Sequence, residues 1–253
     1  MNRNPRFGNP PPPRALDPYD GILIVDKPGG PTSHDVVDSI RRKFRLNKVG
    51  HGGTLDPQAT GLLVILIGKG TKLSNEFMGT DKTYEGILRL GIATDSQDAQ
   101  GKVTKEADYH SVTRDQIEAE MKKRTGDILQ TPPMVSAVKK AGVPLYKLAR
   151  KGQTVDREPR LIHIYEFRLV DFKPPQVSFV MRCTKGTYVR TLCADIGDSV
   201  GCGAHLEQLR RTQSGNLRIE DAIPLDQVLN LTLEEMCLKM IPVSRFSSHS
   251  AQG

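Results

Sequence analysis

The chain has 253 residues, 37% of them hydrophobic, which is enough for one large folded domain. It contains no apolar run of about 20 residues, so a membrane-spanning helix is excluded, and the N-terminus lacks the apolar core of a secretion signal. The four cysteines form no CxxC pair, which argues against a zinc ribbon or a disulfide framework. Reduced thiols are typical of the cytoplasm, and we expect the protein there.

Basic residues outnumber acidic ones by 36 to 29, giving a net charge of +7. They gather in three places: the run RRKFRLNK (41–48), the run KKAGVPLYKLARKG (139–152), and the pair Arg210 and Arg211. One such run is most often a solvated helix face. Three separate runs favour contacts with the phosphates of a polyanion.

The first half of the chain alternates strand and helix patterns. Residues 1–19 are rich in proline and predict a disordered tail. A strand is predicted over 21–27, followed by a helix within 31–46 that has Thr32 or Ser33 as its N-cap. Further predicted elements are a buried strand over 62–68, a short helix over 71–79 and a strand over 83–91.

The second half begins with a predicted helix over 113–126, closed by Gly126. Two strands over 161–172 and 176–184 flank a KPP turn and should pair antiparallel. Helices follow over 187–201 and 204–211. This order predicts an α+β fold, with a mixed, mostly antiparallel sheet flanked by helices, in one domain over 20–246. Residues 247–253 are expected to be a disordered tail.

The loop GHGGTLDPQATG (50–61) holds one carboxylate, Asp56, in a restricted backbone. Its glycines allow positive φ and close backbone approach, and Pro57 keeps Asp56 out of the helical region. One interpretation is a tight turn whose aspartate accepts backbone hydrogen bonds. However, the loop is longer than a hairpin needs, and the basic helix before it would deliver a polyanion to it. An aspartate held for chemistry is therefore the second interpretation.

Six segments, in this order, resemble the motifs of TruB-type tRNA pseudouridine synthases, over nearly the whole chain from residue 21. They are DKPGGPTSHDVV (26–37), GHGGTLDPQATGLLVILIGKGTK (50–72), DKTYEGILRLGIATDSQDAQG (81–101), QTPPMVSAVKKAGVPLYKLARKG (130–152), CTKGTYVRTLCADIG (183–197) and AHLEQLRRTQSG (204–215). The resemblance implies the pseudouridine synthase fold with a central RNA-binding cleft. It also implies isomerisation of uridine 55 in the T loop of tRNA.

In that reaction the bond between uracil N1 and ribose C1′ breaks, the base rotates, and C5 bonds to C1′. The resemblance makes Asp56 the catalytic carboxylate, which attacks covalently or takes a proton from C2′. Burial alone would raise its pKa, so a nearby cation is expected, and Arg190 matches the family's arginine. Tyr84 matches the tyrosine that stacks on the flipped base and helps return the proton from C5.

The resemblance also implies five residues that bind the substrate. Tyr188 should line the pocket, with Leu206 and Leu209 as its apolar floor, and core packing is the alternative for all three. His51 should lie against RNA bases near the flipped nucleotide. A general base is its less favoured alternative, because Asp56 already fills that role. Lys27 is either structural or phosphate-facing.

The family needs neither cofactor nor metal, and we expect none, because the six histidines are scattered rather than at ligand spacing. The implied partner is the T arm of tRNA, bound by a monomer. Many bacterial relatives carry a small C-terminal RNA-binding PUA domain, for which the sequence leaves no room after residue 246. We expect either a short form of the family or a truncated chain, and in both cases contacts to the acceptor stem are in doubt.

Two other functions fit parts of the sequence. A non-catalytic RNA-binding module would explain the basic runs and the tyrosines, although binding alone does not require Asp56, Tyr84 and Arg190 together. An enzyme of the same family that acts on a different RNA stem-loop would explain all of them. Mapping pseudouridine in an unmodified tRNA transcript separates these possibilities.

Overall fold

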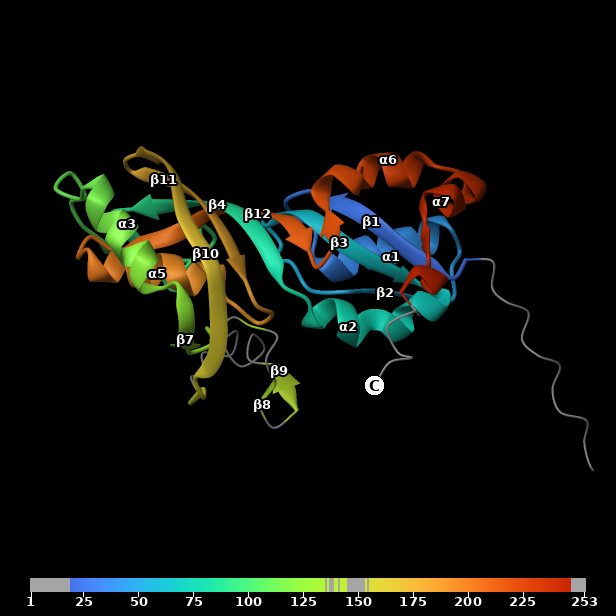
Figure 1. Cartoon of the computed structure of the whole chain (residues 1–253), viewed down its shortest axis with the longest axis horizontal. Helices are drawn as coiled ribbons and strands as arrows, with labels where there is room; N and C mark the ends of the chain where they lie inside the picture. The colour runs from blue at the N-terminus through green and yellow to red at the C-terminus, as the bar shows by residue number, and fades with distance from the viewer. Residues whose placement is uncertain are drawn as a thin grey trace, which may run out of the picture.

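The computed structural model describes residues 19–134, 136, 139–140, 142–144, 153 and 155–246. The two predicted tails, apart from Tyr19, lie outside the described residues, as do Lys147, Arg150 and Lys151 of the second basic run. The described part forms one continuous sheet with helices on its faces, which confirms the predicted α+β class (Figure 1).

The sheet has the strand order β14-β1-β3-β12-β4-β11-β10-β7, and most neighbours are antiparallel. The β1–β14 and β3–β12 pairs are parallel. Its strands are β1 (Gly21–Lys27), β2 (Val49–His51), β3 (Thr60–Ile67), β4 (Lys82–Leu90), β7 (Gly126–Gln130), β10 (Arg160–Lys173), β11 (Gln176–Cys183), β12 (Ala204–Ser214), β13 (Leu217–Arg218), β14 (Ile223–Pro224) and β15 (Ile241–Pro242). Two small ribbons lie apart from it, β5 (Ile92–Thr94) with β6 (Val103–Glu106) and β8 (Lys139–Lys140) with β9 (Val143–Pro144).

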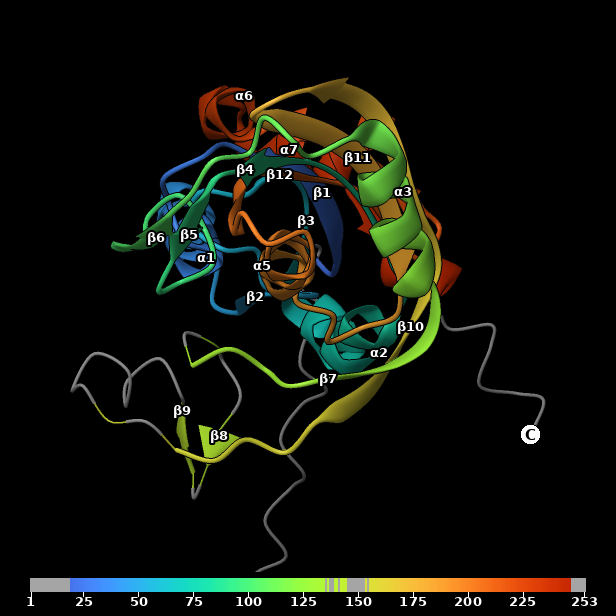
Figure 2. The ribbon, with the colours of Figure 1, turned by 90° about the vertical axis from the view of Figure 1, so that its left-hand side faces the viewer.

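The helices cover the two halves of the sheet separately. They are α1 (Ser33–Lys43), α2 (Ser74–Gly79), α3 (Arg114–Lys123), α5 (Val189–Ser199), α6 (Leu225–Asn230) and α7 (Leu233–Lys239), with single 3-10 turns η1 (Gly68–Leu73), η2 (Ile219–Asp221) and η3 (Val243–Arg245). Helices α1, α6 and α7 pack with one face of β1 and β3, and α2 packs on the other face. Figure 2 shows β4, β12, β11 and β10 curving around α5, with α3 beside it.

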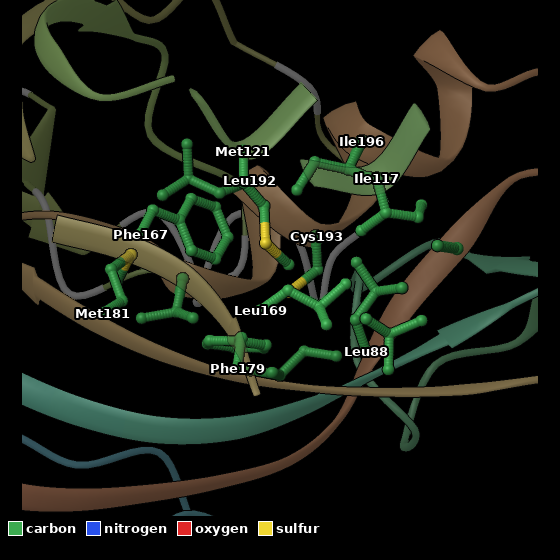
Figure 3. Close-up of a cluster of buried hydrophobic side chains, with 14 of the residues drawn as sticks. Leu88, Ile117, Met121, Phe167, Leu169, Phe179, Met181, Leu192, Cys193 and Ile196 are labelled. Atoms are coloured by element: carbon green, nitrogen blue, oxygen red, sulfur yellow. The ribbon is translucent and has the colours of Figure 1, made fainter. Parts of the chain in front are cut away.

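The larger core lies between this curved half of the sheet and helices α3 and α5 (Figure 3). Phe167 on β10 and Phe179 on β11 meet edge to face, with ring centroids 5.3 Å apart. Met121 from α3 and Leu192 from α5 are almost fully buried against them. Because α5 is anchored by this core, its first turn is held at a fixed place above the centre of the sheet.

Several predicted boundaries are confirmed by their caps. Thr32 is the N-cap of α1, and its hydroxyl and the Asp35 side chain form a reciprocal capping box. The strands over 161–172 and 176–184 form the predicted antiparallel pair, as β10 and β11. The helix predicted over 113–126 is shorter, because α3 ends at Lys123 and Gly126 begins strand β7 instead of closing the helix.

The helix predicted over 204–211 is wrong, since these residues form most of strand β12. The cause is a β-bulge between Leu206 and Gln208. The extra residue places Leu206 opposite Leu88 and Leu209 opposite Gly86, so both leucines face the same side of the sheet. Apolar residues three apart therefore imitate a helical pattern within a strand.

Strand β12 joins the two halves of the molecule. It pairs with β4 along its whole length, but it meets β3 only where Arg210 lies beside Thr60 and Arg211 beside Gly61. Gly61 has φ +98°, and a Cβ there would lie 2.3 Å from the carbonyl oxygen of Arg211. Only glycine permits this close approach.

Gly61→Ala should therefore lower the free energy of unfolding by about 3 kcal/mol or more, because left-handed strain and a backbone clash add together. The matched control is Gly201→Ala, where φ is +88° but a Cβ would meet nothing within 4 Å. Its cost should be only about 1–2 kcal/mol. Chemical denaturation measures both, and equal losses would contradict the claim that the clash at Gly61 matters.

Candidate active site

The loop that carries Asp56 is fastened to the segment between β1 and α1. The Ser33 hydroxyl donates to the Leu55 carbonyl (3.1 Å) and accepts from the Leu55 amide (2.9 Å). On the other side of the aspartate, the Gly30 amide donates to the Pro57 carbonyl (2.9 Å). The backbone is thus held both before and after Asp56, and the start of α1 sets where its carboxylate points.

Lys27, at the end of β1, supports the same loop from beneath. Its side chain is fully buried, and Nζ donates to the carbonyl oxygens of Pro28 and Pro57, each at 2.8 Å. Burial lowers the pKa of Lys27 to about 8, although the nearby Asp56 charge acts to raise it. This geometry suits the structural alternative for Lys27, because the ammonium faces loop carbonyls rather than solvent.

Arg190 stands between two carboxylates. Its Nη1 lies 3.6 Å from Asp56 Oδ2 and 3.4 Å from Asp98 Oδ2. Arg190 is 4% exposed, whereas the Asp56 side chain is 45% exposed towards a cavity. The carboxylate expected to act therefore faces open space on one side and a buried guanidinium on the other.

The pKa of Asp56 is raised, chiefly because the surrounding protein removes much of its hydration. Arg190 opposes this by stabilising the charged form, and so does Lys27, but the Asp98 charge adds to the rise. Because Asp98 shares the guanidinium, the expected cation is present without fully offsetting the effect of burial. A carboxylate poised in this way is a stronger base than an aspartate in water.

The first turn of α5 is fixed from two sides. The Gln130 side chain, at the end of β7, donates to the Tyr188 carbonyl (3.0 Å) and accepts from the Tyr188 amide (2.8 Å). The Thr191 hydroxyl donates to the side chain of Gln97 (2.8 Å), in the loop that carries Asp98. These contacts fix the turn that carries Arg190.

Tyr84 on β4 lies opposite Arg211 on β12. Burial raises the pKa of the Tyr84 phenol to about 12, and the adjacent Arg211 guanidinium acts against this rise. The phosphate role predicted for Arg211 is wrong, because this residue is 1% exposed and donates to three backbone carbonyls inside the protein. Arg210, on the other face of the strand, forms a two-pronged ion pair with Asp26.

A cavity of about 1200 Å³ opens beside Asp56, larger than the roughly 300–1,000 Å³ of an ordinary ligand pocket. Asp56, Arg190, Leu206 and Leu209 all lie on its wall, from three separated parts of the sequence. Other lining residues are Gln58, Thr60, Glu85, Ile87, Asp98, Lys102, Val180 and Gln208. The wall thus combines two leucines with several carboxylates and with the guanidinium groups of Arg190 and Arg210.

The remaining predicted site residues are not on the wall of this cavity. Tyr84 packs against the apolar clusters of both halves of the sheet. The Tyr188 ring is 5.8 Å from the Arg190 guanidinium carbon. His51 lies on β2, where its Nδ1 accepts from the Gly53 amide (3.4 Å), and burial is the main reason that its pKa is lowered.

Sequence reasoning missed Asp98 and Gln130, and it assigned the wrong role to Arg211, although all three shape this site. Each lies within one of the six segments that carry the resemblance. Nothing in the sequence indicates that Asp98 and Asp56 share the Arg190 guanidinium, because the two aspartates are far apart along the chain. The pairing arises because Asp98 forms a β-bridge with Leu206 of β12, the strand that contacts α5.

Among the residues that the structure describes, no three His, Cys, Asp or Glu side chains are grouped so that they could hold a metal ion. In the same described part, no helix is long and apolar enough to cross a membrane.

Comparison with known proteins identifies the family. Residues 41–189 match the profile described as TruB family pseudouridylate synthase (N terminal domain), which is more than half of the chain. Residues 190–241 match the tRNA pseudouridylate synthase B C-terminal domain. The chain belongs to the TruB family.

TruB relatives match over most of this chain. The tRNA pseudouridine synthase B of Opitutus terrae is 52% identical over 224 residues, covering 88% of this chain and 93% of the relative. The protein of the same name from Syntrophotalea carbinolica is 48% identical, covering 83% of this chain and 68% of the relative. That from Dechloromonas aromatica is 44% identical, covering 91% of this chain and 77% of the relative.

Solved structures of larger assemblies share the fold. A crystal structure of a Cbf5-Nop10-Gar1 complex matches with TM-score 0.72 and 30% identity, covering 96% of this chain and 67% of that one. An H/ACA RNP bound to a substrate RNA containing 2′-deoxyuridine matches with TM-score 0.65 and 28% identity, covering 88% and 58%. The predicted pseudouridine synthase fold is confirmed.

Because Asp56 and Asp98 share one guanidinium, removing Arg190 and removing the charge of Asp98 should shift the pKa of Asp56 in opposite directions. Arg190→Ala should raise the pKa of Asp56 further, whereas Asp98→Asn should lower it, because it removes the competing negative charge. The Asp56 carboxyl group would then stay ionised to a lower pH in the second variant. Carbon-13 NMR titration of the Asp56 carboxyl measures each pKa, and a shift in the same direction for both variants would contradict the shared pairing.

Proposed function

We propose that this TruB protein converts uridine 55 in the T loop of tRNA to pseudouridine, with Asp56 as its catalytic carboxylate. The observation that carries the proposal is the Asp56–Arg190 pair on the wall of a cavity large enough for a nucleotide. The relatives named tRNA pseudouridine synthase B supply the substrate class.

The target uridine must leave its stack before any residue reaches its C1′ or C5. Leu206 and Leu209, brought to one face by the bulge in β12, offer an apolar floor for the extruded base. Tyr84 lies next to Leu209 on the neighbouring strand, where its ring can stack on the base. Tyr188, beside Arg190, and His51, at the start of the Asp56 loop, would complete the surroundings of the extruded base.

The chemistry needs an ionised Asp56. Attack on the ribose forms a covalent bond from the carboxylate, whereas elimination takes the C2′ proton, and both use the charged form. Arg190 keeps part of that charge in place despite burial. The N1–C1′ bond breaks and the base turns on the leucine floor. C5 then bonds to C1′ while the carboxylate leaves C1′ or returns its proton to C2′, and N1 takes up a proton as C5 loses one. The proton released from C5 then leaves, and Tyr84, whose phenol stays neutral up to a pH of about 12, can relay it.

Contacts outside the cavity would supply most of the affinity for RNA. The last turn of α1 presents Arg41, Arg42 and Lys43 at the surface, and Lys43 forms no ion pair with the described residues. This helix leads directly to the loop of Asp56, so a phosphate strand that crosses it arrives at the cavity. We further propose that the protein acts as a monomer in the cytoplasm, on the T arm of its substrate.

Asp56→Asn should abolish pseudouridine formation while tRNA binding stays within about tenfold, because binding comes mainly from phosphates and stacking. The test uses an unmodified tRNA transcript, site-specific mapping of pseudouridine, and a filter-binding Kd. Conversion at uridine 55 by the wild type alone supports the proposal. Tight binding by the wild type without conversion would instead identify a non-catalytic RNA-binding module, and conversion of other stem-loops only would identify a different target.

Lys43→Ala should weaken tRNA binding and reduce the slope of log Kd against log salt by about 1, because one phosphate contact is lost. The control is Lys123→Ala on α3, whose ammonium is already paired with Glu120. Its salt slope should match that of the wild type. Equal slopes for Lys43→Ala and the wild type would mean that RNA does not cross the end of α1.

A further inference from the structure

Arg211 is a buried cation whose guanidinium donates to backbone carbonyls of the catalytic loop and of strand β3. Nε donates to the Leu62 carbonyl (2.8 Å), Nη1 to the Thr54 carbonyl (3.3 Å) and Nη2 to the Gly53 carbonyl (3.2 Å). Within the described residues, no carboxylate lies within salt-bridge distance of it. An arginine buried for stability alone is normally paired with an acid, since an apolar side chain would otherwise fill the space at lower cost.

The three carbonyls lie on both sides of Asp56 in the sequence. Gly53 and Thr54 precede it in the loop, and Leu62 follows it at the start of the buried part of β3. One rigid, planar group therefore fixes the entry and the exit of the loop against each other. Ser33 and Lys27 fasten only the middle of the loop, at Leu55 and Pro57.

The same guanidinium also lies against the hydroxyl of Tyr84. Arg211 and Tyr84 face each other across the β12–β4 pair, and their side chains are within hydrogen-bonding and electrostatic reach. Because Arg211 is also the residue at which β12 joins β3 beside Gly61, its side chain and its backbone together tie the loop, β3 and β4 to a common point.

We propose that Arg211 is a positioning residue that sets the Asp56 carboxylate relative to the Tyr84 ring. It never touches the substrate, since it is buried and absent from the cavity wall. The inference rests on the proposed function, in which these two side chains act on the same extruded uridine. Displacing a catalytic group by about 1 Å costs roughly a hundredfold in rate, so a loop that is loosened at both ends should slow the chemical step without weakening RNA binding.

The test measures the single-turnover rate of pseudouridine formation, the Kd for tRNA and the Tm of two variants. Arg211→Met removes the charge and all three hydrogen bonds to carbonyls. Arg211→Lys keeps the charge but loses the planar guanidinium that reaches several carbonyls at once. We expect the rate to fall about a hundredfold in the first and at least about tenfold in the second, with Kd within about threefold of the wild type. If Arg211→Met does not fold, Arg211→Lys alone decides.

The matched control is Lys82→Met. Lys82 is also a buried cation, and its ammonium donates to the carbonyl oxygens of Phe77, Met78 and Thr80 and to the Thr80 hydroxyl. None of these residues belongs to the catalytic loop. The Tm of Lys82→Met should fall as that of Arg211→Met does. Measured well below this Tm, its single-turnover rate of pseudouridine formation should stay within about threefold of the wild type. Equal rate losses in the two variants would reduce Arg211 to a stabilising residue.

Two further outcomes would overturn the proposal. A wild-type rate in Arg211→Lys would show that the fork is not needed, and a weaker Kd with an unchanged rate would make Arg211 part of the RNA surface. The wild-type protein is assayed alongside in every case. No pseudouridine from the wild type rejects the proposed function itself, whereas normal wild-type conversion together with unimpaired Arg211 variants rejects this inference alone.

Discussion

The site depends on one guanidinium that two carboxylates share. Arg190 is buried in the first turn of α5, and it holds Asp56 at 3.6 Å and Asp98 at 3.4 Å. Neither distance is that of a tight ion pair, so the charge of Asp56 is supported without being neutralised. A closer, exclusive pair would lower the pKa of Asp56 and make it a weaker base. The arrangement keeps the carboxylate ionised but reactive, and the rest of the fold keeps Arg190 in place.

Buried cations that bind carbonyl oxygens hold the segments on the Asp56 side of this pair. Lys27, Lys82 and Arg211 are all buried, and each donates to backbone oxygens around the loop of Asp56 or the end of α2. Burial lowers the pKa of both lysines to about 8, so each ammonium is held at a cost to its charged form. Lys27 and Arg211 thereby replace, within the loop of Asp56, the regular hydrogen bonds of a helix or strand, whereas Lys82 holds only the end of α2. The glycine-rich loop can therefore be irregular and still fixed.

Much of this could be predicted from the sequence where local patterns decide structure. Thr32 with Asp35 marks the start of α1, and the turn between β10 and β11 is evident from its prolines. Strand β12 could not be predicted, because a bulge gives its leucines a helical spacing. The motifs pointed to Asp56 and Arg190, but Asp98 and Arg211 were beyond reach, since their roles arise from contacts between distant segments. Arg211 beside Arg210 looked like a surface cation until the sheet placed them on opposite faces.

The join between β12 and β3 also bears on how the molecule moves. Each half of the sheet has its own apolar core, and β12 pairs with β3 only around Arg210 and Arg211, although Lys82 of β4 also donates to carbonyls of α2. The loop of Asp56 belongs to one half, and Arg190, in α5, belongs to the other. A slight spreading along this seam would separate acid from guanidinium while both cores remained intact. Local opening at the short β12–β3 pairing would thus break the Asp56–Arg190 contact well before either half of the sheet unfolded.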